Sequence, residues 1–474
     1  MGRGGYGEGE ALTDGTKVGT LEEQQRRNIR ALIITLIALA AVVAASVIIV
    51  DRSRGAAEAA SVEAAAEPDW VTAAPLIVPL PDEAVEPTGA GLGAVLAAAA
   101  ANPDLGQFSG VVSDAETGQE LWNVGADIAR LPASTTKVLT AAAALLTVPL
   151  DQRLTTRVVE GSNSELVLVA AGDPALTAMP DGGYYPGAAR IGDLVEQVKS
   201  SGVSATRILV DTSIYSGPNM ADGWFPDDIG AGYITPTEPV MIDGGRFDAH
   251  RDESPRSAEP ALDAGRVLAS ALGLDPATVA LGAAPADAAV VAQVQSAPLR
   301  DRLRQMMEHS DNVLAEAIGR EIAINAGASA SFDGATSAIG QALYSAGFDM
   351  NGLVMRDASG LSIDDRVTPR LLDQILLAAS VGERTELRPL LDYLPVAGAT
   401  GSLSARYGGG DRAAAGWVRA KTGTLSDASG LSGYVVTQSG QVLTFAFLSN
   451  GTPPHLARPA LDALAASLRT CGCV

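Results

Sequence analysis

The sequence predicts a multi-domain α+β protein in which an antiparallel sheet is flanked by helices, interrupted by a large insert and preceded by an N-terminal transmembrane helix. Three observations support this prediction. Residues 108–124 have the alternating pattern of a β-hairpin, residues 413–450 have the pattern of further strands, and residues 31–50 are apolar throughout. Because the first and last strand-rich segments can join one sheet, helices from the residues between them can cover its faces.

The apolar segment at residues 31–50, ALIITLIALAAVVAASVIIV, is the first element. At about 1.5 Å per residue it spans about 30 Å as a helix, which is the thickness of a bilayer core. Three arginines precede it and two follow it, so the positive-inside rule places residues 1–30 in the cytoplasm as a short tail. A cleaved signal peptide is the alternative, but its apolar region runs only about 7–15 residues. We therefore expect a single-pass anchor in the cell membrane, with the folded body on the outer, cell-wall side.

Residues 51–90 are rich in Ala, Glu and Pro, which is typical of an extended spacer. The formal net charge of the chain is −22, and residues 1–30 carry five acidic and five basic side chains. The whole excess of negative charge therefore lies on residues 51–474. An acidic body of this kind argues against nucleic acid as a partner.

The folded body is expected to begin at residue 91. Its hairpin turns at Glu116-Thr117-Gly118, and a helix starts near Pro132, with Ser134 as a candidate N-cap. The next predicted elements are a helix at 190–202, a strand at 207–215, a helical segment at 296–327 that breaks at Ser310-Asp311-Asn312, and a closing helix at 457–470. This order predicts one domain from residues 91–155 and 296–474, with residues 156–295 inserted into it.

Cysteine and histidine give no sign of a metal site or of a bound cofactor. The only cysteines are Cys471 and Cys473, at the extreme C-terminus, and the three histidines lack ligand spacing. Free thiols, a local disulfide and an intermolecular disulfide are all compatible with this pair.

The first motif that can carry chemistry is Ser134-Thr135-Thr136-Lys137. Only four of the 33 cationic residues are lysines, and Lys137 alone has a serine three residues before it. Residues i and i+3 share a helix face, so Oγ of Ser134 and Nζ of Lys137 can meet. A serine needs a base to become a nucleophile. A buried lysine can serve as that base when its pKa falls, whereas arginine cannot, because it does not deprotonate.

Two further motifs follow, Ser310-Asp311-Asn312 at the helix break and Lys421-Thr422-Gly423-Thr424 on a predicted strand. Taken alone, the first is a capped helix break and the second a turn at a strand end. In the second, Gly423 permits close backbone approach of a ligand, and Lys421 can bind a carboxylate. The ordered set S-x-x-K, S-D-N and K-T-G is the signature of penicillin-binding proteins and class A β-lactamases.

With these motifs, the chain resembles the D-alanyl-D-alanine carboxypeptidase/endopeptidases of the low-molecular-weight class C penicillin-binding protein family, of actinobacterial type. The 176 residues from Ser134 to Ser310 (310 − 134) leave room for the large insert of that group. The likeness covers about residues 90–470. Further similar stretches are GDPAL (172–176), GYYPGAAR (183–190), VDTSIYSGP (210–218), VMIDGGR (240–246), SDNVLAE (310–316), DASGLS (357–362) and TGSLSARY (400–407). DASGLS departs from the expected DGSGLS at one loop glycine.

The resemblance implies a penicillin-binding, serine β-lactamase-like transpeptidase domain and a role for each matched residue. Ser134 would attack the D-Ala-D-Ala bond of peptidoglycan stem peptides and form an acyl-enzyme, with Lys137 as base and Ser310 as proton relay. Asn312 would hold the substrate amide. The terminal carboxylate would bind to Lys421, Thr422 and Thr424, next to Gly423, and the backbone N–H groups of Ser134 and Thr424 would form the oxyanion hole.

The expected function is that of a membrane-anchored serine DD-carboxypeptidase, with DD-endopeptidase action on cross-links as a possible addition. β-Lactam antibiotics would acylate Ser134 as inhibitors, because they mimic D-Ala-D-Ala. Two alternatives stay open: a serine β-lactamase, and a non-catalytic scaffold that binds peptidoglycan or divisome proteins. The long insert and the anchor argue against the first, and the intact Ser134, Lys137, Ser310 and Lys421 argue against the second.

Overall fold

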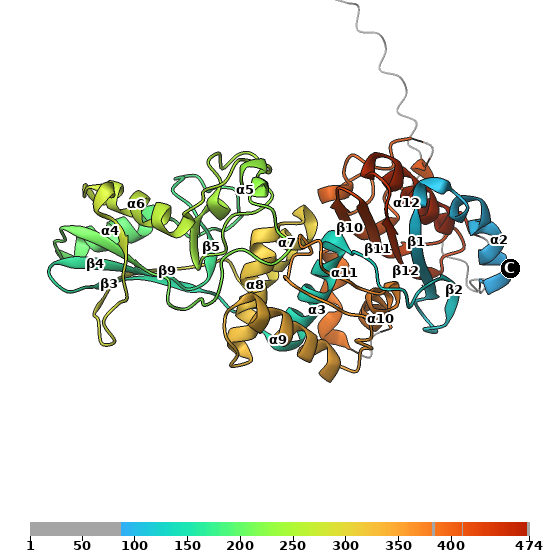
Figure 1. The fold of residues 1–474 in the computed structure, drawn as a ribbon, viewed down its shortest axis with the longest axis horizontal. Helices are drawn as coiled ribbons and strands as arrows, with labels where there is room; N and C mark the ends of the chain where they lie inside the picture. Colours follow the sequence, from blue (N-terminus) through green and yellow to red (C-terminus); the bar gives the residue numbers. More distant parts are fainter. Residues whose placement is uncertain (1–86, 382–383, 410, 472–474) are drawn as a thin grey trace, which may run out of the picture. The chain divides into compact units, whose positions relative to one another are not determined.

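The computed structural model describes residues 87–381, 384–409 and 411–471 (Figure 1). The predicted tail, the predicted membrane span at 31–50 and most of the predicted spacer lie outside these residues. Within the described ranges, no helix has both the length and the apolar character needed to cross a bilayer.

The first sheet joins the two ends of the folded body, as predicted. Its five strands lie in the order β10-β11-β12-β1-β2, and every neighbouring pair is antiparallel. The hairpin strand β1 pairs with β12 along its whole length, from Gln107 opposite Asn450 to Asp114 opposite Leu443. The strands are β1 (Gln107–Asp114), β2 (Glu120–Val124), β10 (Val418–Leu425), β11 (Ala428–Val436) and β12 (Val442–Asn450).

Helices cover both faces of this sheet (Figure 1). Side chains alternate between the faces of a strand, so Ala446 and Leu448 belong to one core while Phe445 and Phe447 belong to the other. The phenylalanine side packs against α2 (Gly89–Ala100) and α12 (Pro454–Arg469). The opposite side packs against α10 (Pro369–Ser380) and the helices around α3 (Lys137–Thr147).

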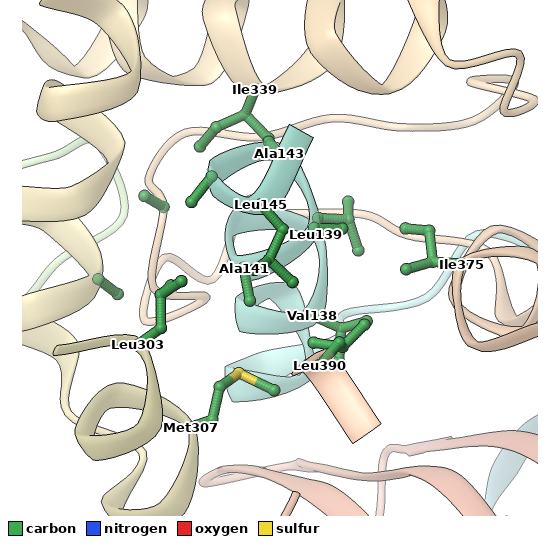
Figure 2. Close-up of a cluster of buried hydrophobic side chains, with 14 of the residues drawn as sticks. Val138, Leu139, Ala141, Ala143, Leu145, Leu303, Met307, Ile339, Ile375 and Leu390 are labelled. Carbon is green, nitrogen blue, oxygen red and sulfur yellow. The ribbon is translucent and has the colours of Figure 1, made fainter. Parts of the chain in front are cut away.

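Helix α3 is buried on nearly every side (Figure 2). Its apolar residues Val138, Leu139, Ala141, Ala143 and Leu145 contact side chains that come from four other helices, among them Leu303, Met307, Ile339, Ile375 and Leu390. These neighbours belong to α7 (Leu299–His309), α9 (Phe332–Ser345), α10 and α11 (Pro389–Asp392). A helix that is apolar all round is a core helix, and burying each large side chain contributes about 1.5–3 kcal/mol. The N-terminus of α3, where Lys137 lies, is therefore held firmly.

Residues 155–295 contribute a second sheet in the order β8-β6-β4-β3-β9, with α4 and α6 packed on it (Figure 1). They also contain the short parallel pair β5-β7. The elements are β3 (Thr155–Glu160), β4 (Glu165–Val169), β5 (Asp173–Leu176), α4 (Ile191–Ser201), β6 (Arg207–Asp211), α5 (Asp227–Ala231), β7 (Val240–Ile242), α6 (Pro260–Leu272), β8 (Ala280–Leu281) and β9 (Val290–Gln295).

Some predicted element boundaries are wrong by a few residues. The strand expected at 207–215 ends at Asp211, because the carboxylate of Asp211 accepts a hydrogen bond from the Ser213 N–H and turns the chain. Helix α2 begins at Gly89, inside the spacer predicted to run to residue 90, because the Thr88 hydroxyl caps it through the Gly91 N–H. Cys471 is disulfide-bonded, which excludes the free thiol for that residue.

Candidate active site

Ser134 lies in a short 3₁₀-helix, Ala133–Thr136, that leads directly into α3. Its side chain caps no backbone group, so the prediction of Ser134 as an N-cap is wrong. A 3₁₀-helix has about three residues per turn, so side chains at i and i+3 eclipse one another. Lys137 Nζ accordingly lies 2.9 Å from Ser134 Oγ. The predicted pair is therefore brought together by a tighter turn than the one expected.

Glycines let β10 and a nearby loop lie against this turn. A Cβ on Gly423 would sit 2.6 Å from the Pro132 carbonyl oxygen, and one on Gly360 would sit 2.0 Å from the Ala133 carbonyl oxygen. Ala133 itself has φ 48°, a conformation that costs a non-glycine residue free energy. Gly423 is thus needed for close approach of the protein's own chain, whereas the sequence suggested close approach of a ligand.

Lys137 is fully buried, and three oxygens surround its amine. Nζ lies 2.9 Å from Ser134 Oγ, 2.6 Å from Asn312 Oδ1 and 2.7 Å from the Ser359 carbonyl oxygen. A neutral amine has two N–H donors, which suit the amide and carbonyl oxygens, and one lone pair, which then faces the Ser134 hydroxyl. Burial lowers the pKa of Lys137 to about 8, although nearby carboxylates, led by Asp357 and Asp311, oppose this shift.

Ser310 and Lys421 form a second pair. Ser310 ends α7 in the left-handed region, with φ 61°, and its Oγ accepts a hydrogen bond of 2.8 Å from Lys421 Nζ. Lys421 also donates to the Thr422 carbonyl oxygen and is fully buried. Burial lowers its pKa well below the ordinary value, and the positive charge of Lys137 lowers it further. Two buried ammonium groups repel each other, so the protonation states of the two lysines are linked.

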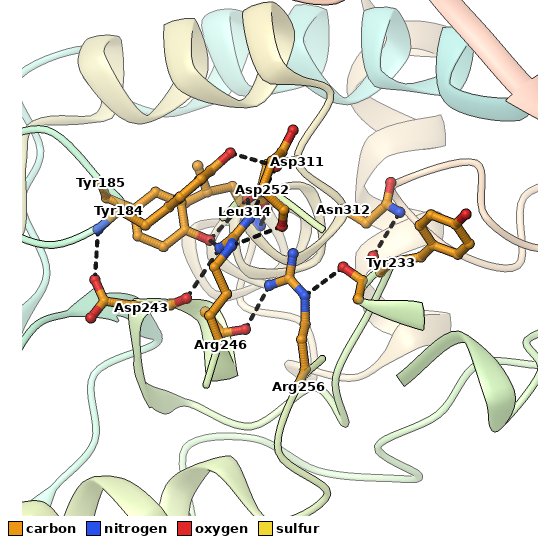
Figure 3. A network of polar contacts seen from close by, with 12 residues as sticks. Tyr184, Tyr185, Tyr233, Asp243, Arg246, Asp252, Arg256, Asp311, Asn312 and Leu314 are labelled. Carbon is orange, nitrogen blue, oxygen red and sulfur yellow. Dashed lines mark hydrogen bonds and ion pairs between the residues drawn. The ribbon is translucent and has the colours of Figure 1, made fainter. Parts of the chain in front are cut away.

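Asn312 begins α8 (Asn312–Asn325) and links Lys137 to the inserted segment. Its Oδ1 accepts from Lys137, and its Nδ2 donates to the Tyr233 carbonyl oxygen at 3.0 Å (Figure 3). Both ends of the amide therefore have protein partners before substrate arrives. A substrate amide that binds Asn312 would compete with the carbonyl of Tyr233.

The K-T-G-T strand β10 is an edge strand, and its open edge faces the site. Ala420 N–H points to that edge, where it donates to the Pro395 carbonyl oxygen. Because N–H groups alternate along a strand, those of Thr422 and Thr424 point the same way. The Thr422 hydroxyl lies 2.7 Å from Ser402 Oγ, and the Thr424 hydroxyl accepts from Arg458 Nε at 3.1 Å. The eight predicted site residues thus lie on three segments: the turn into α3, the junction of α7 and α8, and β10.

The loop DASGLS (357–362) contributes partners that the prediction missed. Asp357 accepts from the Gly360 N–H at 2.6 Å and from Trp224 Nε1 at 2.7 Å, and so fixes the loop whose Ser359 carbonyl holds Lys137. Ala358 replaces the glycine expected in this loop, and its backbone has no positive φ, so the side chain is tolerated. The stretch was visible in the sequence as part of the resemblance, but its backbone contact with Lys137 leaves no pattern in side chains.

No candidate metal centre accompanies these groups. In the part of the chain that the structure describes, no three or more His, Cys, Asp or Glu side chains are arranged to hold an ion. The groups that the described segments bring together at the site are two serines, two lysines, an asparagine and backbone donors.

Comparison with known proteins places this arrangement in a family. The model of the D-Ala-D-Ala carboxypeptidase 3 (S13) family matches residues 92–255 and 246–470. A carboxypeptidase of Mycobacterium tuberculosis is 52% identical over 404 residues, covering 84% of this chain and 87% of that relative. Carboxypeptidase DacB of Mycolicibacterium smegmatis is 50% identical over 440 residues, which cover 91% of this chain and 95% of that relative.

The fold comparison agrees. The crystal structure of penicillin-binding protein 4 from Haemophilus influenzae superposes with a TM-score of 0.65 at 20% sequence identity, covering 80% of this chain and 98% of that one. A second structure of that protein, in complex with a β-lactam, gives a TM-score of 0.57. The predicted resemblance is confirmed, and the chain belongs to the D-Ala-D-Ala carboxypeptidase 3 (S13) family.

Proposed function

We propose that this D-Ala-D-Ala carboxypeptidase hydrolyses the terminal D-Ala-D-Ala bond of peptidoglycan stem peptides through an acyl-enzyme on Ser134. The observation that carries the proposal is the 2.9 Å contact between Ser134 Oγ and the buried amine of Lys137. Family membership supports the reaction class, since the relatives at 50% and 52% identity are carboxypeptidases.

Acylation begins from neutral Lys137. Its lone pair accepts the Ser134 hydroxyl proton while Oγ attacks the carbonyl carbon of the penultimate D-Ala. Asn312 Oδ1 and the Ser359 carbonyl hold the other two amine protons and stabilise the ammonium that forms. General-base catalysis of this kind supplies about 10²–10⁴-fold.

The negative charge that develops on the substrate oxygen is bound by backbone donors. Ser134 lies in the first turn of a helix, where N–H groups have no intrahelical acceptor, and Thr424 N–H points to the open edge of β10. Each such donor is worth about 3–4 kcal/mol in known oxyanion holes. Thr422 and Thr424 also offer hydroxyls to the substrate carboxylate, with Lys421 behind them.

The leaving group departs when the C–N bond breaks and the amine of D-Ala takes a proton. Ser310 Oγ supplies that proton, and the proton that Lys137 took from Ser134 returns to Ser310, while Lys421, 2.8 Å away, stabilises the negative charge on Ser310 Oγ during the transfer. Lys137 is then neutral again. Water then attacks the Ser134 ester while neutral Lys137 accepts a proton from it. Lys137 returns this proton to Ser134 Oγ as the ester C–O bond breaks, and the shortened stem leaves. A β-lactam would follow the same acylation step but would retain its leaving amine in the ring-opened adduct.

We also propose that residues 31–50 anchor the enzyme in the cell membrane, with residues 1–30 in the cytoplasm and the catalytic body outside. The support is the uncharged apolar run of bilayer length and the arginine bias at its ends. Membrane fractionation with protease protection tests this: the body should be digested in intact spheroplasts, and recovery in the soluble fraction would contradict the anchor.

The experiment for the reaction uses the full chain, a synthetic pentapeptide stem and fluorescent penicillin. Wild type should release D-alanine and become labelled, Ser134→Ala should do neither, and Ser345→Ala, on the exposed side of α9, should behave as wild type. Release of D-alanine by Ser134→Ala would refute the acyl-enzyme. Fast turnover of penicillin without a lasting label would favour a β-lactamase. A Ser134→Ala strain that matches wild type in cell-wall composition, while a deletion strain does not, would favour a scaffold.

A further inference from the structure

The second motif is held from the inserted segment by one buried arginine, Arg246. Two stretches noted in the sequence, GYYPGAAR (183–190) and VMIDGGR (240–246), converge on it (Figure 3). Arg246 follows three residues with positive φ: Asp243 at 49°, Gly244 at 66° and Gly245 at 77°. A Cβ on Gly244 would lie 2.4 Å from the Tyr185 hydroxyl oxygen, so only glycine fits there. The turn is built to present Arg246 to the catalytic domain.

Every N–H donor of the Arg246 guanidinium has an acceptor. Nε donates to the Asp252 carbonyl oxygen at 3.1 Å, Nη1 to the Tyr185 hydroxyl at 3.0 Å and the Asp243 carbonyl oxygen at 3.1 Å, and Nη2 to Asp311 Oδ2 at 3.1 Å and Asp252 Oδ1 at 3.5 Å. The guanidinium also lies over the Tyr184 ring, 3.4 Å from its centroid. The side chain is fully buried, so this geometry is fixed.

Asp311 is the point at which this network enters the active site. Its Oδ2 accepts from Arg246 and from the Tyr185 hydroxyl at 2.9 Å, while its Oδ1 accepts from the Leu314 N–H at 2.8 Å and caps α8. Burial alone would raise the pKa of Asp311, but Arg246 and Arg256 overcome this and hold it at about 2. Asp311 is therefore an anchored carboxylate between Ser310 and Asn312.

We propose that Arg246 is a positioning residue for the reaction: through Asp311 it holds the hydroxyl of Ser310 and the amide of Asn312 where the two lysines can use them. This rests on the proposed function, because it needs Ser310 and Asn312 to act in catalysis. Ser310 keeps a left-handed backbone that costs a non-glycine residue free energy, so a rigid neighbour is needed to impose it. The inserted segment thereby completes the catalytic site.

The ion pair between Arg246 and Asp311 also affects the pKa of Lys137. The titratable groups that face Lys137 are Lys421, Asp357, Asp311, Glu316 and Asp365. Burial raises the pKa of Glu316 to about 7 and that of Asp365 well above its ordinary value. The charge of Asp311 raises the pKa of Lys137, and Arg246 offsets that charge. Removing Arg246 should raise the pKa of Lys137, whereas removing the charge of Asp311 should lower it.

The test compares Arg246→Gln, Asp311→Asn and the double variant, in the full chain, for the rate of acylation by fluorescent penicillin from pH 5 to 10. Arg190→Gln, at an exposed ion pair of the inserted segment, is the control. Acylation per folded molecule should fall about 10²-fold in Arg246→Gln, as expected for a misplaced catalytic group. The rise of the acylation rate with pH, which reports the pKa of Lys137, should move to higher pH in Arg246→Gln and to lower pH in Asp311→Asn. In acylation rate the double variant should match Asp311→Asn, since the two residues act as one unit. Its pH profile should return toward that of wild type, because the two pKa shifts of Lys137 oppose each other.

Thermal unfolding separates positioning from folding. If Arg246→Gln unfolds, Tyr185→Phe removes one hydrogen bond to Asp311 without exposing a charge, and it should lower acylation while leaving the melting temperature within a few degrees. Wild-type rates and pH profile in folded Arg246→Gln, or in Tyr185→Phe where that is the folded variant, would overturn the proposal. A wild-type chain that is neither labelled nor active would instead overturn the proposed function on which it rests.

Discussion

Replacing Lys137 with arginine keeps the positive charge and removes the proton chemistry, so Lys137→Arg isolates the base. Lysine can lose a proton at neutral pH when it is buried, whereas arginine stays protonated in proteins. The structure gives both the reason for the difference and its size. Lys137 is fully buried, and its pKa falls from 10.5 to about 8.

The magnitude follows from the fraction of neutral amine. At about pH 7.5, a group with a pKa of about 8 is roughly one quarter neutral, whereas one with the ordinary value of 10.5 is about 0.1% neutral. Burial therefore supplies about 200-fold more free base. With arginine this population vanishes, so we expect acylation to fall by at least the ~10² of general-base catalysis, and by as much as ~10⁴.

The assay is the rate of labelling by fluorescent penicillin, with D-alanine release as the second readout. Lys137→Met has similar length and no charge, so it shows whether the larger arginine acts only by crowding. In both variants acylation should fall by this ~10²–10⁴ while the melting transition stays cooperative, and Lys199→Arg, at an exposed position on α4, should be as active as wild type. If Lys137→Arg is acylated within about tenfold of the wild-type rate, Lys137 is not the base.

Three more predictions follow from the same geometry. Gly423→Ala should lower acylation about 10²-fold, because its Cβ would lie 2.6 Å from the Pro132 carbonyl oxygen, just before the turn that carries Ser134. As a control, Gly192→Ala should leave the rate unchanged, because a Cβ there meets open space. Wild-type acylation by Gly423→Ala would show that the turn can shift freely. D-Alanine release should rise with pH through about 8, since neutral Lys137 is the reactive form, and a flat profile across that range would contradict this. Burial raises the pKa of Glu316 from 4.5 to about 7, so its contribution to stability is full below 4.5 and is lost as pH rises through 7. This loss is about 3 kcal/mol of the free energy of unfolding. In Glu316→Gln, the free energy of unfolding measured with denaturant should therefore depend less on pH. An unchanged pH dependence would contradict the raised pKa of Glu316.

The three motifs of the candidate site could be located from the sequence because each is a local pattern. Ser134 and Lys137 are close in the chain, Ser310 and Asn312 mark a helix break, and Lys421 lies on a strand with clear alternation. The pairing of β1 with β12 could also be expected, because strands at the two ends of a domain can join one sheet and share its core. The exact local geometry was not accessible: Ser134 was expected to cap a helix, but it lies in a 3₁₀ turn.

The contacts that hold the site residues in place could not be predicted, because they join segments that are distant in the sequence. Ser359 holds Lys137 through a backbone carbonyl, which leaves no mark in side-chain identity. Arg246 contacts Asp311, which lies 65 residues further along the chain, and nothing in the stretch VMIDGGR indicates that Asp311 is its partner. The two glycines in the stretch signal a special turn, but only the fold shows what the turn presents.

The central claim is that Ser134 becomes acylated during turnover, and it is tested most directly by peptide mapping with mass spectrometry. The full chain is quenched during reaction with penicillin and, separately, with a D-Ala-D-Ala pentapeptide at low pH, where deacylation is slow. We expect one adduct in each reaction, on the peptide that contains Ser134, with D-alanine released in step with it from the pentapeptide. An adduct on another residue, or product formation with no adduct and undiminished turnover by Ser134→Ala, would contradict it.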